Sequence, residues 1–357
     1  MNSIRTRIAS FCDHYGMTRP VLLAPMAGAC PPSLTVAVIN GGGVGACGAL
    51  LMSPADIASW ADSVRQQTRG PFQINLWIPD PPPVRNAVKE AAVAEFLGKW
   101  GPAIAAGAGN IAPLDFASQC HAVLAAAPAV VSSIMGLFPE SFVAQLKAQG
   151  IAWFATATTR QEAIAAERAG ADAIVAQGME AGGHRGCFLA ESAERRQVGL
   201  FALLPAIVDA VRVPVIATGG IADARGVAAA LMLGASAVQI GTGFLRAPEA
   251  QLPAQWAAAL HTTAPEGTVL TRAFSGRAGR SIETAYVSDA GSPGAPVPAP
   301  YPVQRALTAA MRSDAVLRGD VQRMQAWAGQ ACALAQALPA AEIVRSVWSG
   351  AESLLSG

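Results

Sequence analysis

Short, uniformly apolar runs recur along the chain, and stretches of mixed polarity separate them. The eight runs cover residues 20–25, 43–47, 72–76, 129–134, 152–155, 173–176, 213–218 and 237–241. Each is too short for a helix of a protein core, and none alternates like a strand with one face in water. Such runs are typical of strands buried on both sides, as in a parallel sheet.

The stretches between the runs predict helices over residues 33–40, 139–149, 160–169, 200–211 and 223–233. Ser33 follows a Pro-Pro turn and is a candidate N-cap. Gly150, Gly170 and Gly234 follow three of the other helices, which is where a left-handed residue commonly ends a helix. Strands and helices alternating in this number predict an α/β fold, a (β/α)8 or TIM barrel. A doubly wound open sheet is the structural alternative.

Two regions do not fit the alternation. Residues 77–128 separate the third and fourth runs, and the chain after residue 250 is too long for one closing helix. Within the latter, residues 288–302 form a Pro/Gly/Ala loop, residues 304–338 return to a helical pattern, and Pro339 is a candidate stop signal. We expect a barrel domain of residues 1–77 and 129–249, a mostly helical cap over the barrel of 78–128 and 250–330, and a C-terminal helix in 331–357 of unknown packing.

Composition narrows the function classes. The 357 residues are 52% hydrophobic and 14% charged, which excludes a disordered chain. A net charge of +1 predicts no nucleic-acid or membrane partner, and no apolar run reaches the roughly 18 residues of a spanning helix. The beginning of the sequence shows no secretory signal pattern. The six cysteines are scattered without a CxxC pair, so we expect reduced thiols in a cytoplasmic protein.

Glycines follow the last two runs, where a barrel builds its active site at the C-terminal ends of the strands. Gly219 and Gly220 follow the seventh run, and Gly241 and Thr242 end the eighth. This pair of loops is the usual phosphate site of a barrel, because glycine lets backbone N–H groups approach the oxygens. The alternative is that these glycines only make tight turns.

His184 is the best candidate for proton chemistry, since it lies in the glycine-rich loop after the sixth run and imidazole titrates near neutral pH. The alternative is a loop histidine that only hydrogen-bonds the backbone. Glu180 could orient it or be solvated, Arg185 could hold an anion or face water, and Cys187 is more simply a small packed residue. The other histidines show no metal-binding spacing, so we expect no metal.

Other acid and base groups are few, which points to a cofactor that carries the chemistry. Residues 43–48 match GxGxxG, but they overlap a predicted strand and follow a predicted helix, so a dinucleotide fingerprint is not favoured. A flavin mononucleotide suits a single phosphate grip. Asn75 and Gln177 are the groups we expect to hydrogen-bond its ring.

Seven segments, in order along the chain, resemble the nitronate monooxygenase family, formerly called 2-nitropropane dioxygenases. They are LLAPMAGA (22–29), AVINGGGVGACGA (37–49), PFQINLW (71–77), AQGMEAGGHRG (176–186), VPVIATGGIADARG (213–226), GASAVQIGTGFL (234–245) and FSGRAGR (274–280). The resemblance implies a TIM barrel that binds FMN and no metal. The implied cofactor contacts are Ala24, Pro25 and Met26 against the ring, Asn75 and Gln177 at its polar edge, Gly183, and, around the phosphate, Gly182, Gly219, Gly220, Gln239, Ile240, Gly241 and Thr242.

The resemblance also implies a reaction. His184 matches the family histidine that removes the α-proton of a neutral nitroalkane. The implied activity is oxidation of an alkyl nitronate by O₂ to a carbonyl compound and nitrite, in a monomer or homodimer that detoxifies nitroalkanes.

The chain departs from the family at two places. Gln73 stands where the family usually has glycine, which bears on the environment of the ring. The chain has three tyrosines, whereas the better studied members line the substrate pocket with several, and Tyr301 is the candidate pocket residue. Two other functions stay open: a flavin-dependent enoyl-acyl carrier protein reductase that uses NAD(P)H, and a flavin-binding barrel without turnover.

Overall fold

The computed structural model describes residues 2–356, and eight of its strands form one barrel. Their bounds are β1 Val21–Leu23, β2 Gly45–Gly48, β3 Phe72–Trp77, β4 Val130–Ile134, β5 Ala152–Ala157, β6 Ala173–Gln177, β8 Val215–Thr218 and β9 Ala237–Ile240. All pairs are parallel, in the order β1-β9-β8-β6-β5-β4-β3-β2. A parallel bridge between Leu22 and Val44 joins the two ends of this order, so the sheet closes. The predicted barrel is confirmed, and the open-sheet alternative is wrong.

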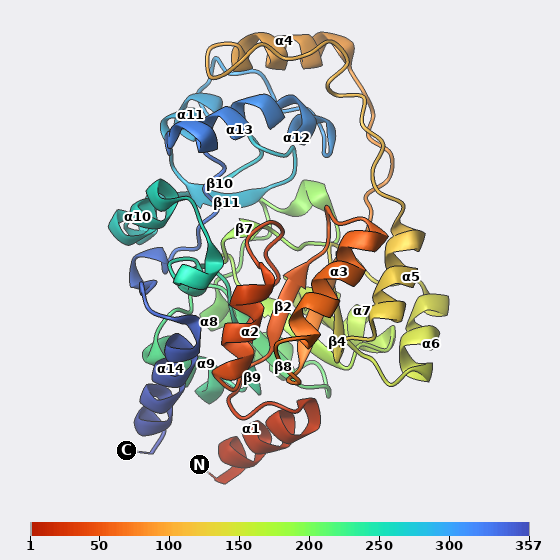
Figure 1. Cartoon of the computed structure of the whole chain (residues 1–357), viewed down its shortest axis with the longest axis vertical. Coiled ribbons are helices and arrows are strands. Elements are labelled where there is room, and N and C mark those ends of the chain that lie inside the picture. The colour runs from red at the N-terminus through yellow and green to blue at the C-terminus, as the bar shows by residue number, and fades with distance from the viewer. Residues whose placement is uncertain (1, 357) are drawn as a thin grey trace.

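Helices surround the barrel (Figure 1). They are α2 Pro32–Asn40, α3 Pro54–Arg65, α5 Phe116–Ala126, α6 Glu140–Ala148, α7 Arg160–Arg168, α8 Leu200–Val208, α9 Ala224–Met232 and α14 Ala340–Leu354. Gly150, Gly170 and Gly234 adopt φ of +68°, +97° and +108° after α6, α7 and α9, as expected of residues that end helices. The N-cap prediction at Ser33 is wrong: Pro31 precedes α2, and the Ser33 hydroxyl donates to the Glu249 carbonyl.

The N-terminal helix α1 (Asn2–Tyr15) lies below the barrel in Figure 1. Its Tyr15 ring packs edge-on against Phe154 of β5, with 4.9 Å between ring centroids, and Phe11 contacts both rings. These apolar contacts bury the end of the barrel opposite to the predicted site. This end of the barrel therefore contributes to stability and not to the site.

A second layer, which we call the cap, lies above the barrel (Figure 1). It comprises α4 Ala87–Leu97, α10 Ala254–Thr262, α11 Ala285–Ala290, α12 Val303–Leu307, α13 Ala309–Arg318, β10 Thr268–Thr271 and β11 Gly279–Ile282. Leu97 of α4 shares an apolar cluster with Phe274, Tyr286 and Met311, so segments far apart in the sequence form one small core. The cap also contains a sheet, because β10, β11 and the short β7 (Gly183–His184) pair antiparallel.

Three observations refine the expected cap. Helix α5 packs on α3 and belongs to the outer layer of the barrel. The helical pattern predicted over 304–338 ends at Arg318, and most of the chain from there to residue 339 is irregular. Pro339 therefore precedes a helix instead of stopping one: it is the N-cap residue of α14, which packs on α9 and α2.

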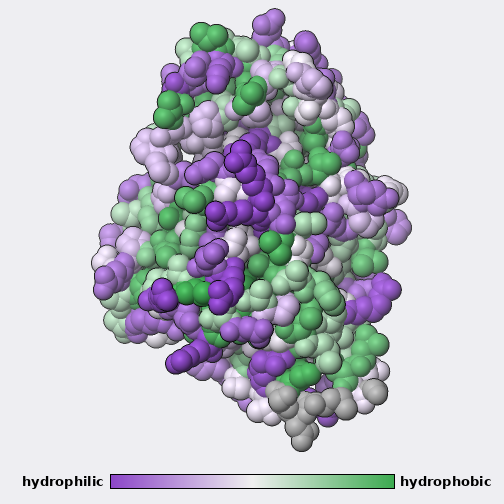
Figure 2. All heavy atoms as spheres, turned by 180° about the vertical axis from the view of Figure 1, so that it is seen from behind, coloured by the Kyte–Doolittle hydropathy of each residue, from purple (hydrophilic) through white to green (hydrophobic). Residues whose placement is uncertain are grey.

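Short 3₁₀ turns complete the structure at Ala190–Ser192, Thr242–Phe244, Pro248–Ala250, Pro265–Gly267 and Cys332–Leu334. None of the helices in residues 2–356 is long and apolar enough to cross a membrane. Hydrophilic and hydrophobic residues are interspersed over the rear face in Figure 2.

Candidate active site

A cavity lies at the C-terminal ends of the barrel strands, and Trp256 and Arg305 of the cap also line it. Most residues predicted for the site line it: Ala24, Pro25, Met26, Asn75, Gln177, Gly182, Gly183, His184, Gly219, Gly220, Gln239, Gly241 and Thr242. Residues 325–331, which we call the closing segment, cover it from the C-terminal part of the chain and contribute Trp327 and Gly329. The expectation that the site lies at the C-terminal ends of the strands thus located this cavity, which segments distant in the sequence build together.

Two predicted residues lie elsewhere. Ile240 is 1% exposed, and its side chain belongs to the barrel core. Its backbone carbonyl accepts a hydrogen bond from Ala24, so it fixes the chain beside the cavity. Tyr301 packs against the indole of Trp77, with 5.4 Å between ring centroids, and does not line the cavity.

The glycine loops form a cradle that only glycine permits. Gly219 and Gly220 have φ of +108° and +69°, where other residues are strained. A Cβ on Gly182 would lie 2.5 Å from the amide nitrogen of Gly329 in the closing segment. In the described part of the chain, the backbone N–H groups of Gly219, Gly220 and Gly241 donate to no protein acceptor. Free N–H groups in a concave turn are the donors that a phosphate requires.

A chain of amides fixes the orientation of Gln239 at the cavity. The Nε2 of Gln73 donates to the carbonyl of Leu23 and to the Oε1 of Gln239, both at 3.0 Å. The carbonyl accepts only, so Gln73 must present its nitrogen, and Gln239 must present its oxygen to Gln73. The Nε2 of Gln239 is thereby left as a donor at the cavity. Gln73 is fully buried, and its own Oε1 has no partner among residues 2–356.

Gln177 lines the cavity, and its amide also bonds the loop that carries His184. Its Nε2 donates to the carbonyl of His184, and its Oε1 accepts from the backbone N–H of Gly186. The amide therefore holds the loop that carries the histidine. Asn75 lines the cavity; its Nδ2 donates to Ser132, and its Oδ1 accepts no hydrogen bond within residues 2–356.

His184 lies on β7 between two indoles. Its ring centroid is 4.8 Å from that of Trp77 and 4.9 Å from that of Trp327. Burial, together with the positive charges of Arg277 and Arg305, lowers the pKa of His184 to about 3. The imidazole is therefore neutral at physiological pH, and its Nε2 lies 2.8 Å from the Ser275 hydroxyl.

The charged neighbours of His184 in the sequence point away from it. Glu180 accepts hydrogen bonds from the N–H of Leu200 at the start of α8. Arg185 is 4% exposed and donates to the carbonyl of Gln177 at 2.6 Å. Cys187 is buried, which raises the pKa of its thiol. These residues support the loop: within residues 2–356, the guanidinium of Arg185 donates to backbone carbonyls, and the thiol of Cys187 is buried.

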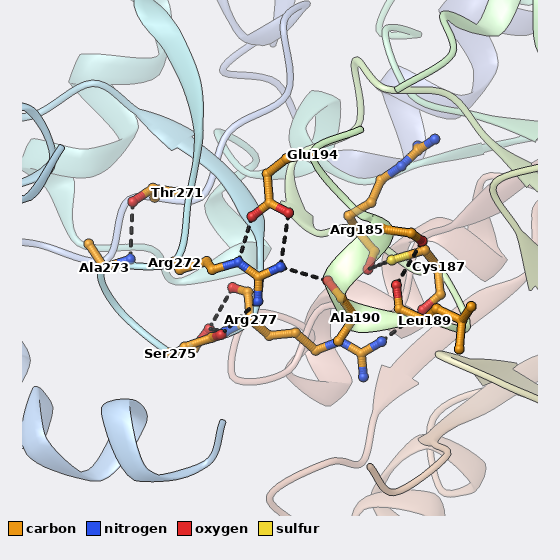
Figure 3. A network of polar contacts seen from close by, with 12 residues as sticks. Arg185, Cys187, Leu189, Ala190, Glu194, Thr271, Arg272, Ala273, Ser275 and Arg277 are labelled. Atoms are coloured by element: carbon orange, nitrogen blue, oxygen red, sulfur yellow. Dashed lines mark hydrogen bonds and ion pairs between the residues drawn. The ribbon is translucent and has the colours of Figure 1, made fainter. Parts of the chain in front are cut away.

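A buried arginine ties this loop to the cap. Arg277 donates to the carbonyl of Cys187 at 2.7 Å and to the carboxylate of Asp80 at 2.6 Å. Beside it, Arg272 bonds Glu194 and the Ala190 carbonyl (Figure 3). The β7 loop is thus held from the cap side by two guanidinium groups.

Sequence reasoning missed the residues around the histidine. Trp77 ends the third strand and Ser275 lies in FSGRAGR, so both stood in segments already singled out. Trp327 and Arg305 lie in stretches without a motif, and only the fold brings them to the cavity. The GxGxxG match is structural: residues 45–48 form β2, and a Cβ on Gly48 would lie 2.6 Å from the amide nitrogen of Ala27.

The fold and the cavity define a class: barrel enzymes whose glycine loops suit a phosphate-bearing cofactor beside a neutral histidine. The chain belongs to the nitronate monooxygenase family, whose model matches residues 10–350. This membership makes it a flavin-dependent oxidoreductase.

Individual proteins of known name or structure are similar to this chain over nearly its whole length. The chain is 39% identical to the nitronate monooxygenase of Paraburkholderia phytofirmans over 334 residues, covering 92% of this chain and 91% of the relative. It resembles the structure of nitroalkane oxidase from Streptomyces ansochromogenes with a TM-score of 0.87 and 32% identity, covering 97% of this chain and 99% of that one. FabK from Thermotoga maritima follows with a TM-score of 0.75 and 27% identity, covering 97% of each chain.

Proposed function

We propose that this protein binds FMN and oxidises alkyl nitronates with O₂ to a carbonyl compound and nitrite, and that His184 lets it also use neutral nitroalkanes. The observation that carries the proposal is the juxtaposition of the glycine cradle with a neutral imidazole in one cavity. The names of the relatives support the substrate class.

The residues present fit FMN. The N–H groups of Gly219, Gly220 and Gly241 would hold its phosphate, and the amides of Asn75 and Gln239 would bond the polar edge of its ring. The cradle offers one compact group of donors, which suits a single phosphate. When bound, the flavin supplies the electron transfer from the nitronate to O₂.

Positive charge at the cavity favours an anionic substrate. Arg305 lines the cavity, and its guanidinium donates to no acceptor within residues 2–356. Arg305 and Arg277 both act on His184 electrostatically. A nitronate carries the negative charge that this environment lacks, whereas the corresponding nitroalkane is neutral.

The negative charge of the nitronate product explains how a weakly basic histidine removes a proton. Moving the α-proton of a nitroalkane to His184 creates an imidazolium and a nitronate side by side. The nitronate offsets the charge that burial opposes, so the ion pair forms together. The indoles of Trp77 and Trp327 flank the ring and keep water from competing for it.

A reducing compartment such as the cytoplasm suits the chain. All six cysteines are buried free thiols, and none needs a disulfide partner.

The test combines two measurements on the purified flavin-loaded protein. Mass spectrometry of the released cofactor should give FMN, and propyl-2-nitronate in air should yield nitrite. FAD would contradict the cofactor assignment. No nitrite from a panel of nitronates, together with rapid NADH oxidation in the presence of a crotonyl thioester, would replace the proposed function with the reductase.

A further inference from the structure

Within residues 2–356, one side chain forms a hydrogen bond with a ring nitrogen of the histidine at the cavity. Ser275 and His184 are 91 residues apart, and the Nε2 of His184 lies 2.8 Å from the Ser275 Oγ. The pairing of β7 with β11 places His184 opposite Gly279, just after the turn that carries Ser275. Ser275 is 0% exposed, so the protein alone determines which hydrogen bonds its hydroxyl makes.

The serine hydroxyl has one proton and two neighbours that could accept it. The carbonyl of Arg277 lies 3.0 Å from Oγ, while the N–H of Arg277 donates to Oγ at 3.3 Å (Figure 3). That carbonyl has no other donor in the described chain. An unsatisfied buried carbonyl costs about 1–3 kcal/mol, so the hydroxyl proton belongs to it. The Oγ lone pair then faces His184 as an acceptor.

An accepting Oγ requires a donating Nε2. We propose that Ser275 is a positioning residue that keeps the proton of neutral His184 on Nε2, so that Nδ1 is the atom that accepts the α-proton of a nitroalkane. His184 lines the cavity, and its Nδ1 has no hydrogen-bonding partner within the described residues.

The proton and electron balance is simple. The C–H electron pair stays on the substrate and becomes the nitronate, the proton moves to Nδ1, and the proton on Nε2 remains with Ser275. The opposite tautomer would present an N–H to the substrate and could not act as a base. The substrate in this step rests on the proposed function, but the tautomer is a property of the protein alone.

The first test reads the tautomer directly. The chain has four histidines, so ¹⁵N-histidine labelling of the flavin-loaded protein gives few signals, and His184→Asn assigns the one in question. At pH 7 we expect the proton on Nε2 in the wild type and a mixture of tautomers in Ser275→Ala. A proton on Nδ1 in the wild type overturns the proposal.

The second test separates positioning from structure. Ser275→Ala should lower kcat/KM for neutral nitroethane by at least about tenfold, which is part of the roughly 10²–10⁴-fold that a placed base contributes. It should change turnover of preformed ethylnitronate less than about twofold, because that substrate needs no proton removed. Ser275→Thr keeps the hydroxyl and should restore most of the nitroethane activity.

A matched control uses another fully buried serine of the cap. Ser281 is 0% exposed, and its hydroxyl donates to the Ala326 carbonyl without touching His184. Ser281→Ala should leave both the tautomer and the ratio of the two activities unchanged. Equal losses on nitroethane and ethylnitronate in Ser275→Ala would show a structural role and overturn the proposal. Absence of both activities in the wild type would instead refute the proposed function, and the ¹⁵N spectrum would still decide the tautomer.

Discussion

The ion pair of Arg277 and Asp80 joins the cap to the segment after β3, across 197 residues of sequence. The arginine side chain is 2% exposed and the carboxylate is 24% exposed. The other interaction of the guanidinium is with the Cys187 carbonyl, and its Nε is buried without a partner in the described chain. Asp80→Asn would therefore leave a buried positive charge uncompensated.

The cost follows from that burial. Breaking one side of a buried ion pair typically costs about 3–5 kcal/mol. Asp80 is a quarter exposed, so water screens part of the effect, and we expect about 2–3 kcal/mol of lost unfolding free energy. Arg277→Met removes the buried charge itself, so Asp80→Asn should cost little in that background. The double variant should be about as stable as Arg277→Met alone.

The assay is urea denaturation of the flavin-loaded protein and its variants, analysed as a double-mutant cycle. The matched control is Arg318→Gln, which breaks a pair with Asp314 in which the arginine is 71% exposed and should change little. A coupling energy between Asp80 and Arg277 below about 0.5 kcal/mol, which is typical of exposed ion pairs, would show that burial does not strengthen this pair.

Three further predictions concern the cavity. The pKa of His184 is about 3 in the folded chain and about 6.5 when unfolded, so the unfolded state binds more protons between these values. Stability is therefore lost as pH falls below 6.5, and between pH 7 and 5 the wild type should lose about 2 kcal/mol more than His184→Asn by urea denaturation. Gln73→Leu should raise the FMN dissociation constant by about 3–10-fold in a fluorescence titration, because Gln239 loses the hydrogen bond that orients it. An unchanged dissociation constant would contradict this role of Gln73. Arg305→Gln should raise KM for a nitronate by up to about fivefold in steady-state kinetics and leave KM for the neutral nitroalkane nearly unchanged; equal effects would show that its charge does not select the anion.

The barrel was predictable because its strands are buried on both faces, so each reads as a short apolar run without alternation. The cradle was predictable too, since Gly219, Gly220 and Gly241 follow runs whose order along the chain sets their place in the barrel. Both inferences use local sequence and one rule of connectivity.

The surroundings of His184 were not predictable in this way. Trp327 and Arg305 reach the cavity through the folding of the irregular segments of the cap, which carry no periodic pattern. Gln177 shows a second limit: it lies at the expected strand end, yet its amide is used by the loop that it holds. Position alone does not tell a cavity-facing amide from a structural one.

The most direct test of the central claim is an anaerobic absorbance titration of the purified protein with propyl-2-nitronate. We expect oxidised-flavin bands in the near ultraviolet and blue that change as nitronate is added and return when air is admitted, with nitrite formed in proportion. Flavin bands that stay unchanged at saturating nitronate, or a protein that carries no flavin, would contradict it.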